Sequence, residues 1–178
     1  VEGLVQFFKL DEWWFDTFSE DERDLIERSY DPLGDGSNPL TRGKVTAGDT
    51  RSLTQSLLEA ARRLPSHAPL ELRERLWRQA EQTAISTRDA LTMHFLYQDA
   101  MLAYYNARDS RPDALDKSWE FVLKQVKIAP RAAEAYRTAY PGQPLPTHVG
   151  FKRLCSVYEK QNQFEAALKH AQTAREQG

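Results

Sequence analysis

The chain has 178 residues and a formal net charge of −2 at pH 7, and 40% of its residues are hydrophobic. This length suits one domain, or one domain with an appendage, and can bury about 70% of the unfolded surface. The single cysteine, Cys155, excludes an internal disulfide. No apolar run approaches the roughly 18 residues of a membrane span, and no signal-peptide pattern occurs, so we expect a cytoplasmic protein.

Residues 1–48 are expected to form an aromatic and acidic N-terminal arm that ends in a short helix and a loop. Six aromatic side chains gather near its start: Phe7, Phe8, Trp13, Trp14, Phe15 and Phe18. So many large apolar groups need burial, either against the helical part of the same chain or against a partner, which includes a second copy of the chain. Residues 11–35 carry ten Asp or Glu against two Arg, which argues against an anionic membrane surface.

A capping box predicts the helix of the arm. The Ser19 side chain can accept from the backbone N–H of Glu22, and the Glu22 side chain can accept from that of Ser19. We expect a helix over about residues 20–30 with the contact face Leu25, Ile26 and Tyr30. The Gly- and Pro-rich residues 31–49 then form a loop that completes neither a calcium loop nor a P-loop, so no metal or cofactor is expected there.

Residues 49–178 are expected to form an all-α domain that begins with an antiparallel helix pair. Asp49 is the expected N-cap of the first helix, Pro65 ends it, and Pro69 opens the second. Apolar residues recur at helical spacing in both: Leu53, Leu57, Ala60, Ala61 and Leu64, then Leu72, Leu76, Trp77, Ala80 and Ala84. The short link between the helices makes them antiparallel neighbours.

The most apolar helix of the chain is expected over about residues 88–108. Its apolar residues point in nearly every direction, which is typical of a helix packed on several sides. Pro112 opens a partner helix, whose expected contact face is Leu115, Trp119, Val122, Leu123 and Val126. Pro130 is expected to end that helix and to open a separate short one, with a small-residue surface, that reaches Tyr140.

Residues 147–178 show the clearest pattern of the chain. Thr147 is the expected N-cap of a helix with the face Phe151, Leu154, Cys155 and Tyr158. A polar break at residues 161–163 precedes a second helix with the stripe Phe164, Ala167, Leu168, Ala171 and Ala174. Small residues in this stripe let two helix axes approach closely. Cys155 is expected to be a small core residue rather than a reactive thiol.

This helix pair resembles a tetratricopeptide repeat. Counted from residue 148, the matching places are Phe151 fourth, Leu154 seventh, Cys155 eighth, Tyr158 eleventh, and Ala167, Ala171 and Ala174 at twenty, twenty-four and twenty-seven. Cys155 departs from the usual Gly or Ala, and Ala171 from the usual large aromatic. A degenerate copy runs from Tyr97 to Pro130, and the chain also looks like some uncharacterised prokaryotic proteins. The resemblance implies antiparallel helix pairs stacked as a short TPR-like α-solenoid, with the aromatic arm at its N-terminus.

The resemblance also implies a non-enzymatic scaffold that binds a protein or peptide segment. Ligand contacts in tetratricopeptide repeats come mainly from the first helix of each pair. Transferred to this sequence, those places are Val149, Lys152, Arg153, Ser156, Glu159 and Lys160. Lys152 and Arg153 suit an acidic partner or a terminal carboxylate, although a merely solvated basic face is the alternative interpretation.

Two other functions stay open. Residues 62–88 are rich in Arg, which would suit a nucleic-acid-associated accessory protein, but the glutamates Glu71, Glu74 and Glu81 interrupt the basic section and make nucleic acid the less favoured partner. An enzyme is less favoured still, because the four histidines lack metal-ligand spacing and no catalytic motif occurs. A deep pocket with convergent polar groups and shifted ionisation would favour an enzyme.

Overall fold

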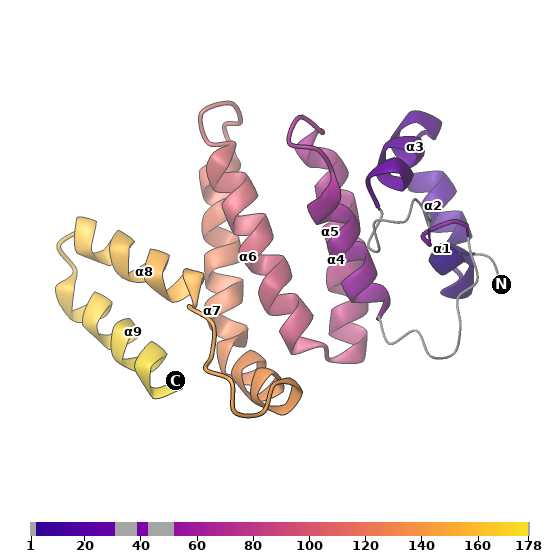
Figure 1. Ribbon diagram of the computed structural model, residues 1–178. Coiled ribbons are helices and arrows are strands. Elements are labelled where there is room, and N and C mark those ends of the chain that lie inside the picture. The colour runs from indigo at the N-terminus through magenta and orange to yellow at the C-terminus, as the bar shows by residue number, and fades with distance from the viewer. Residues whose placement is uncertain (1–2, 31–38, 43–51, 178) are drawn as a thin grey trace. The chain divides into compact units, whose positions relative to one another are not determined.

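The computed structural model describes residues 3–30, 39–42 and 52–177, and over these ranges the chain is all-α, with nine helices and no strand (Figure 1). The predicted fold class is therefore confirmed at the level of an all-α chain. The chain divides into two compact units, with the boundary in the sequence between Ser86 and Thr87, and each unit is described by itself below. The domain boundary predicted at residues 48–49 lies outside the described residues.

The nine helices of the described ranges are divided between the two units. The N-terminal unit contains α1 (Gly3–Phe7), α2 (Asp11–Thr17), α3 (Glu20–Ser29), α4 (Leu53–Arg63) and α5 (Leu70–Thr87). The C-terminal unit contains α6 (Ala90–Asn106), α7 (Ala114–Ala139), α8 (Val149–Lys160) and α9 (Phe164–Gln177). No helix in the described ranges has both the length and the apolar composition that a bilayer crossing requires.

The aromatic arm forms α1 and α2 rather than an extended segment. Gly3 begins α1 at φ +73°, and a Cβ there would lie 2.6 Å from the backbone of Thr41, so a side chain would be strained and would clash. Trp14 and Phe18 are buried, in agreement with the prediction that the arm packs on its own chain. Phe15 stays 61% exposed, and pairing of two chains through the arm remains a prediction.

The capping box predicted for α3 is confirmed. The Ser19 hydroxyl accepts from the Glu22 backbone N–H at 3.3 Å, and the Glu22 carboxylate accepts from the Ser19 N–H at 3.0 Å. Ile26 and Tyr30 of the predicted contact face are completely buried, and Leu25 is half-buried. Local sequence therefore fixes both the start of this helix and the side that it buries.

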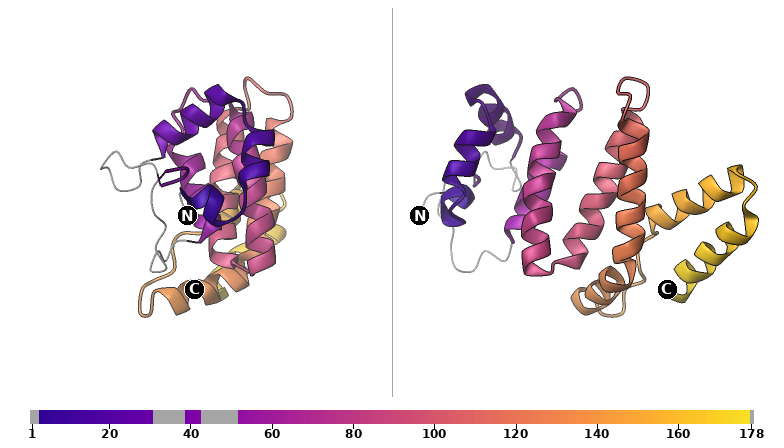
Figure 2. Two further views of the ribbon diagram at one scale, coloured as in Figure 1. Left: turned by 90° about the vertical axis from the view of Figure 1, so that its right-hand side faces the viewer. Right: turned by 180° about the vertical axis from the view of Figure 1, so that it is seen from behind.

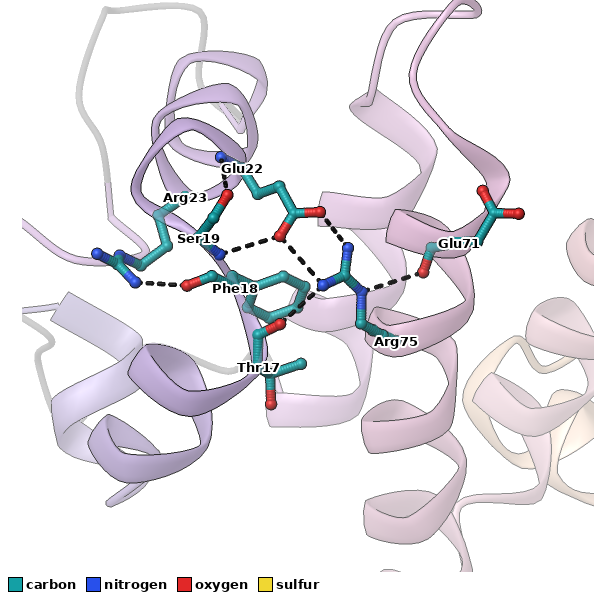
Figure 3. Close-up of polar contacts among 7 residues, drawn as sticks. All are labelled: Thr17, Phe18, Ser19, Glu22, Arg23, Glu71 and Arg75. Carbon is teal, nitrogen blue, oxygen red and sulfur yellow. Dashed lines mark hydrogen bonds and ion pairs between the residues drawn. The ribbon is translucent and has the colours of Figure 1, made fainter.

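The same Glu22 carboxylate joins α3 to α5 through Arg75 (Figure 3). Arg75 Nη1 donates to Glu22 Oε2 at 3.0 Å and to the Thr17 carbonyl at 2.7 Å, and Nη2 pairs with Glu22 Oε1. The guanidinium also lies over the Phe18 ring, 5.1 Å from its centroid. These contacts, led by the hydrogen bond from Arg75, lower the pKa of Glu22. One arginine thus ties the arm and α3 to α5.

Helices α4 and α5 lie side by side as an antiparallel pair (Figures 1 and 2). The buried residues include nearly all of the predicted stripes: Leu57, Ala60, Ala61, Leu64, Leu72, Leu76, Trp77, Ala80 and Ala84. The predicted cap Asp49 was wrong, because Ser52 caps α4 through a capping box with Gln55. Arg73 donates to the carbonyls of Leu64 at 2.9 Å and Pro65 at 2.8 Å, which satisfies groups left open where α4 ends.

In the C-terminal unit, α6 packs along α7, and buried residues lie on more than one side of α6, as expected. Asp89 caps α6 by accepting from the Thr92 N–H at 2.9 Å. A core of Met101, Val122 and Leu154 joins α6, α7 and α8.

The prediction that Pro130 ends this helix was wrong. The helix runs unbroken from Ala114 to Ala139 with Pro130 inside it, and its later part turns away from the axis of the earlier part (Figures 1 and 2). Proline lacks the N–H that would bond to the preceding turn, which accounts for the bend. Pro130 itself is exposed, whereas its neighbours Ile128, Ala129 and Ala132 are buried, and their packing offsets the lost bond.

The buried face of α7 agrees only in part with the predicted one: Val122 is buried, and Trp119 and Val126 pack against the core. Leu115 and Leu123 are exposed, at 55% and 47%, whereas Ser118 and Gln125 are buried. The Ser118 hydroxyl donates to the Met101 carbonyl at 3.0 Å, so this polar group is satisfied inside the unit. A pattern of apolar residues alone could not find a face that includes bonded polar groups.

Helices α8 and α9 form the predicted hairpin. His148, rather than Thr147, caps α8, because its Nδ1 accepts from the Phe151 N–H at 3.2 Å. The rings of Tyr158 and His170 stack across the hairpin with centroids 5.4 Å apart. The predicted stripe of α9 is only partly covered, because Ala167 is buried whereas Phe164 and Leu168 are about 60% exposed.

We expect Arg75→Ala to lower the free energy of unfolding of the N-terminal unit by about 1 to 2 kcal/mol, because it removes charge-assisted hydrogen bonds that are only partly exposed. Urea unfolding followed by tryptophan fluorescence measures the change. Arg78→Ala is the matched control, because Arg78 is exposed on the same helix. Equal effects of the two substitutions would contradict a structural role for Arg75.

Candidate functional site

A pocket of about 560 Å³ lies within the C-terminal unit and is lined by residues of α6, α7, the segment before α8, α8 and α9. This volume falls in the range of ligand sites. The lining residues are Leu91, His94, Ala129, Ala132, Ala133, Tyr136, Leu145, Pro146, Thr147, His148, Phe151, Lys152, Cys155, Ala171, Ala174 and Gln177.

Alanines make much of the pocket wall. Ala129, Ala132 and Ala133 come from α7, and Ala171 and Ala174 come from α9. Side chains this short do not fill the space between the helices, so the volume stays open. The alanine stripe of α9, which the sequence suggested would bring two helices close, therefore contacts α8 at Ala167 and lines the pocket farther along.

The polar end of the pocket is positioned by Gln125, a completely buried residue of α7. Its Oε1 accepts from the Gly150 N–H at 2.8 Å, and its Nε2 donates to the His94 carbonyl at 3.2 Å. The amide thereby joins α6, α7 and the first turn of α8. Gly150 leaves room for it, because a Cβ at this position would lie 2.6 Å from Gln125 Oε1.

This network indicates which nitrogen of each histidine carries the proton. Because Gln125 Oε1 is the acceptor for Gly150, the amide NH₂ is the group that faces His94 Nε2, at 3.4 Å, and it also lies 3.5 Å from Gln98 Oε1. When this amide donates to His94 Nε2, that nitrogen is the acceptor and Nδ1 carries the hydrogen. His148 Nδ1 accepts from the Phe151 N–H, so its Nε2 carries the hydrogen.

Among the described residues, neither His94 Nδ1 nor His148 Nε2 has a hydrogen-bond partner, and both atoms are buried. The two rings meet edge to face, with centroids 4.9 Å apart. A buried donor without an acceptor destabilises a fold by about 1 to 3 kcal/mol. Two neighbouring rings that line the pocket thus each have a buried nitrogen without a partner among the described residues.

Both histidines are neutral at pH 7. Burial lowers the pKa of His94 to about 4, with a further contribution from the nearby His148. Burial also lowers the pKa of His148, although the nearby backbone of Gln125 and of His148 itself partly opposes this shift. Each neutral imidazole carries one N–H donor.

Cys155 and Lys152 complete the polar groups of the pocket. Burial and the charge of Glu159 raise the pKa of Cys155, and its thiol donates to the Ala167 carbonyl at 3.4 Å. A protonated, hydrogen-bonded thiol is a poor nucleophile. The predicted core position of Cys155 was wrong, because its side chain is half-buried and lines the pocket. Lys152 is exposed and is the one charged residue of this lining.

Of the six partner-binding residues predicted from sequence, Lys152 lines the pocket. Val149 packs against the Met101, Val122 and Leu154 core, and the Arg153 guanidinium lies 4.0 Å from the centroid of the Tyr105 ring. Three others are exposed on α8 and do not line the pocket: Ser156, Glu159 and Lys160. The pocket therefore brings one member of the predicted set together with residues that sequence reasoning passed over.

The residues missed are His94, Gln125 and His148. Both histidines had been judged by metal-ligand spacing along the chain, and that test cannot detect a pair that only tertiary packing brings together. Gln125 lies on the side of α7 that the apolar pattern assigned to solvent. The small residues after Pro130 were the one signal in this region that the sequence offered.

We expect Gly150→Ala to destabilise the C-terminal unit by about 1 to 3 kcal/mol, because the new methyl group would displace the Gln125 amide. Urea unfolding followed by circular dichroism measures this change. In a Gln125→Ala background the penalty should be clearly smaller, because Gln125 Oε1, the closest atom at 2.6 Å, is gone and the tightest contact left is His148 Cε1 at 3.2 Å. An undiminished penalty in the double variant would contradict the close contact.

The lowered pKa of His94 predicts a loss of stability in acid. Protonation favours the unfolded chain, so the contribution is intact above pH 6.5 and falls by up to about 3 kcal/mol as the pH drops from 6.5 towards 4. Urea unfolding at pH 7 and pH 4.5 should show a smaller loss in His94→Gln than in the unmodified chain. An NMR titration in which His94 protonates near pH 6.5 would contradict this prediction.

The chain matches no protein-family model, no curated protein and no solved structure with which it was compared. The resemblance of residues 148–178 to a tetratricopeptide repeat therefore remains a prediction from the sequence.

Proposed function

We propose that the C-terminal unit is a non-enzymatic, TPR-like scaffold that binds a protein or peptide segment in the pocket lined by α6, α7, α8 and α9. The observation that carries this proposal is the pocket itself, about 560 Å³ with walls of small apolar residues. Short apolar side chains in the lining leave room for an apolar side chain of a partner and impose little selectivity for its shape. Pockets of this kind commonly pair an apolar body with a few polar groups that fix orientation.

The charge of the lining supports an acidic partner. Lys152 contributes a positive charge, and no carboxylate side chain belongs to the lining of this pocket. A carboxylate of the partner would thus meet an ammonium group and two neutral N–H donors without like-charge repulsion. We therefore still propose an acidic partner, as the sequence suggested, with Lys152 as the main positive charge that attracts it.

The ionisation of the pocket favours binding over catalysis. The lowered pKa values of His94 and His148 come mainly from burial, and the Cys155 pKa is shifted away from the thiolate. A nucleophile paired with a general base would need the opposite shift of the thiol. Three residues with shifted pKa values therefore line one pocket. Each shift favours the uncharged form of the side chain, which supports binding rather than catalysis.

Binding of nucleic acid through the Arg-rich section has less support. Arg63 pairs with Glu59 at 2.7 Å, Arg73 bonds to backbone carbonyls, and Arg75 is held by Glu22. Arginines already engaged within the chain contribute little to a phosphate-binding surface.

A pocket-filling substitution tests the proposed function. Peptides selected from a random display library on the unmodified chain should bind Ala171→Trp at least tenfold more weakly, because the indole occupies the pocket. Gln172→Trp is the matched control, since Gln172 is exposed beside Ala171 and does not line the pocket. Fluorescence anisotropy of the labelled peptide measures its affinity for both variants. Failure to select any peptide, or equal binding to the two variants, would refute the pocket as the binding site.

A further inference from the structure

The two unsatisfied imidazole N–H groups specify the chemistry of the ligand more narrowly than the pocket shape does. His94 is only 5% exposed, and its Nδ1 lacks an acceptor in the described part of the chain, as does His148 Nε2. Buried donors in folded proteins nearly always have a partner. Both residues line the same pocket, so one bound group can serve both.

The missing group must be a hydrogen-bond acceptor. The lone pairs of His94 Nε2 and His148 Nδ1 already face N–H donors, from Gln125 and Phe151 respectively. The free nitrogens therefore offer hydrogens, which exclude a cation and suit an oxygen. Both atoms are shielded from solvent, so a small rotation of each ring about its broad terminal torsion is needed to meet the ligand.

We propose that the pocket binds an apolar group that ends in a carboxylate, whose oxygens accept from His94 and His148 while the apolar part lies against the alanine wall. Lys152 favours a carboxylate over a neutral carbonyl, because it is the one charge in the lining. This inference rests on the proposed use of the pocket for binding. Two sources share this chemistry, a free aliphatic acid and the C-terminal residue of a peptide.

Calorimetric titration with octanoate, octan-1-ol and octylamine tests the carboxylate. Octanoate should bind at least tenfold more tightly than octan-1-ol, which has the same tail without the charge, and octylamine should bind most weakly. Lys152→Gln should reduce the preference for octanoate several-fold. Lys160→Gln should not, since Lys160 is exposed on the same helix and does not line the pocket.

Nitrogen NMR of the histidine side chains tests the two donors directly. Octanoate should shift the resonances of His94 Nδ1 and His148 Nε2 more than those of the other nitrogen of each ring. His148→Asn keeps a helix-capping side chain but lacks the ring N–H, and it should lose most of the octanoate affinity while still folding. Unchanged nitrogen resonances on binding, or full affinity in this variant, would overturn the assignment.

Two peptides with the same sequence and a C-terminal leucine, one with a free carboxylate and one amidated, separate the two sources. Preference for the free-acid peptide over octanoate identifies a chain terminus, and the reverse identifies a free acid. If octan-1-ol binds as tightly as octanoate, the carboxylate inference fails while binding in the pocket stands. If no probe binds but the library peptides still depend on the pocket, only this inference fails, and if neither binds, both proposals fail.

Discussion

The C-terminal unit depends on one buried amide, that of Gln125. A polar group without contact with water must find its partners inside the protein, and this one, on α7, finds them on α6 and α8. Its bonds hold the first turn of α8 against α6 and α7, which places His148 beside His94. Gly150 follows from the same constraint, because any side chain there would occupy the space of the amide. The pocket and its polar end are consequences of satisfying a single glutamine.

Alanine in a helix pair has two opposite consequences in this unit. Where α9 contacts α8, Ala167 is buried and its carbonyl accepts from the Cys155 thiol. Farther along, Ala171 and Ala174 line an open volume together with alanines of α7 beyond the bend. Close packing needs an opposing surface as well as small side chains. The direction that α7 takes after Pro130 therefore determines which alanines become core and which become pocket wall.

The electrostatics of the two units follow different principles. In the N-terminal unit, the contacts with Arg75 lower the pKa of Glu22, and both side chains are partly exposed and bonded to each other and to backbone groups. In the pocket, burial keeps His94 and His148 neutral, and one buried nitrogen of each ring has no hydrogen-bond partner among the described residues. The first arrangement is complete within the chain and stabilises it. The hydrogen bonding of the two histidines is incomplete within the described residues. This difference is the physical reason for proposing that the pocket binds a ligand and that Arg75 has a structural role.

The sequence by itself determined the features that depend on neighbouring residues: the all-α class, the capping box of α3, the buried stripe of α5 and the hairpin of α8 and α9. Each arises from interactions within a few turns of helix, where spacing and side-chain chemistry suffice. Only the tertiary structure decided that α7 continues through Pro130, that Gln125 is buried, and that His94 meets His148. These outcomes depend on packing energies and hydrogen bonds between residues far apart in the chain, which no local pattern encodes.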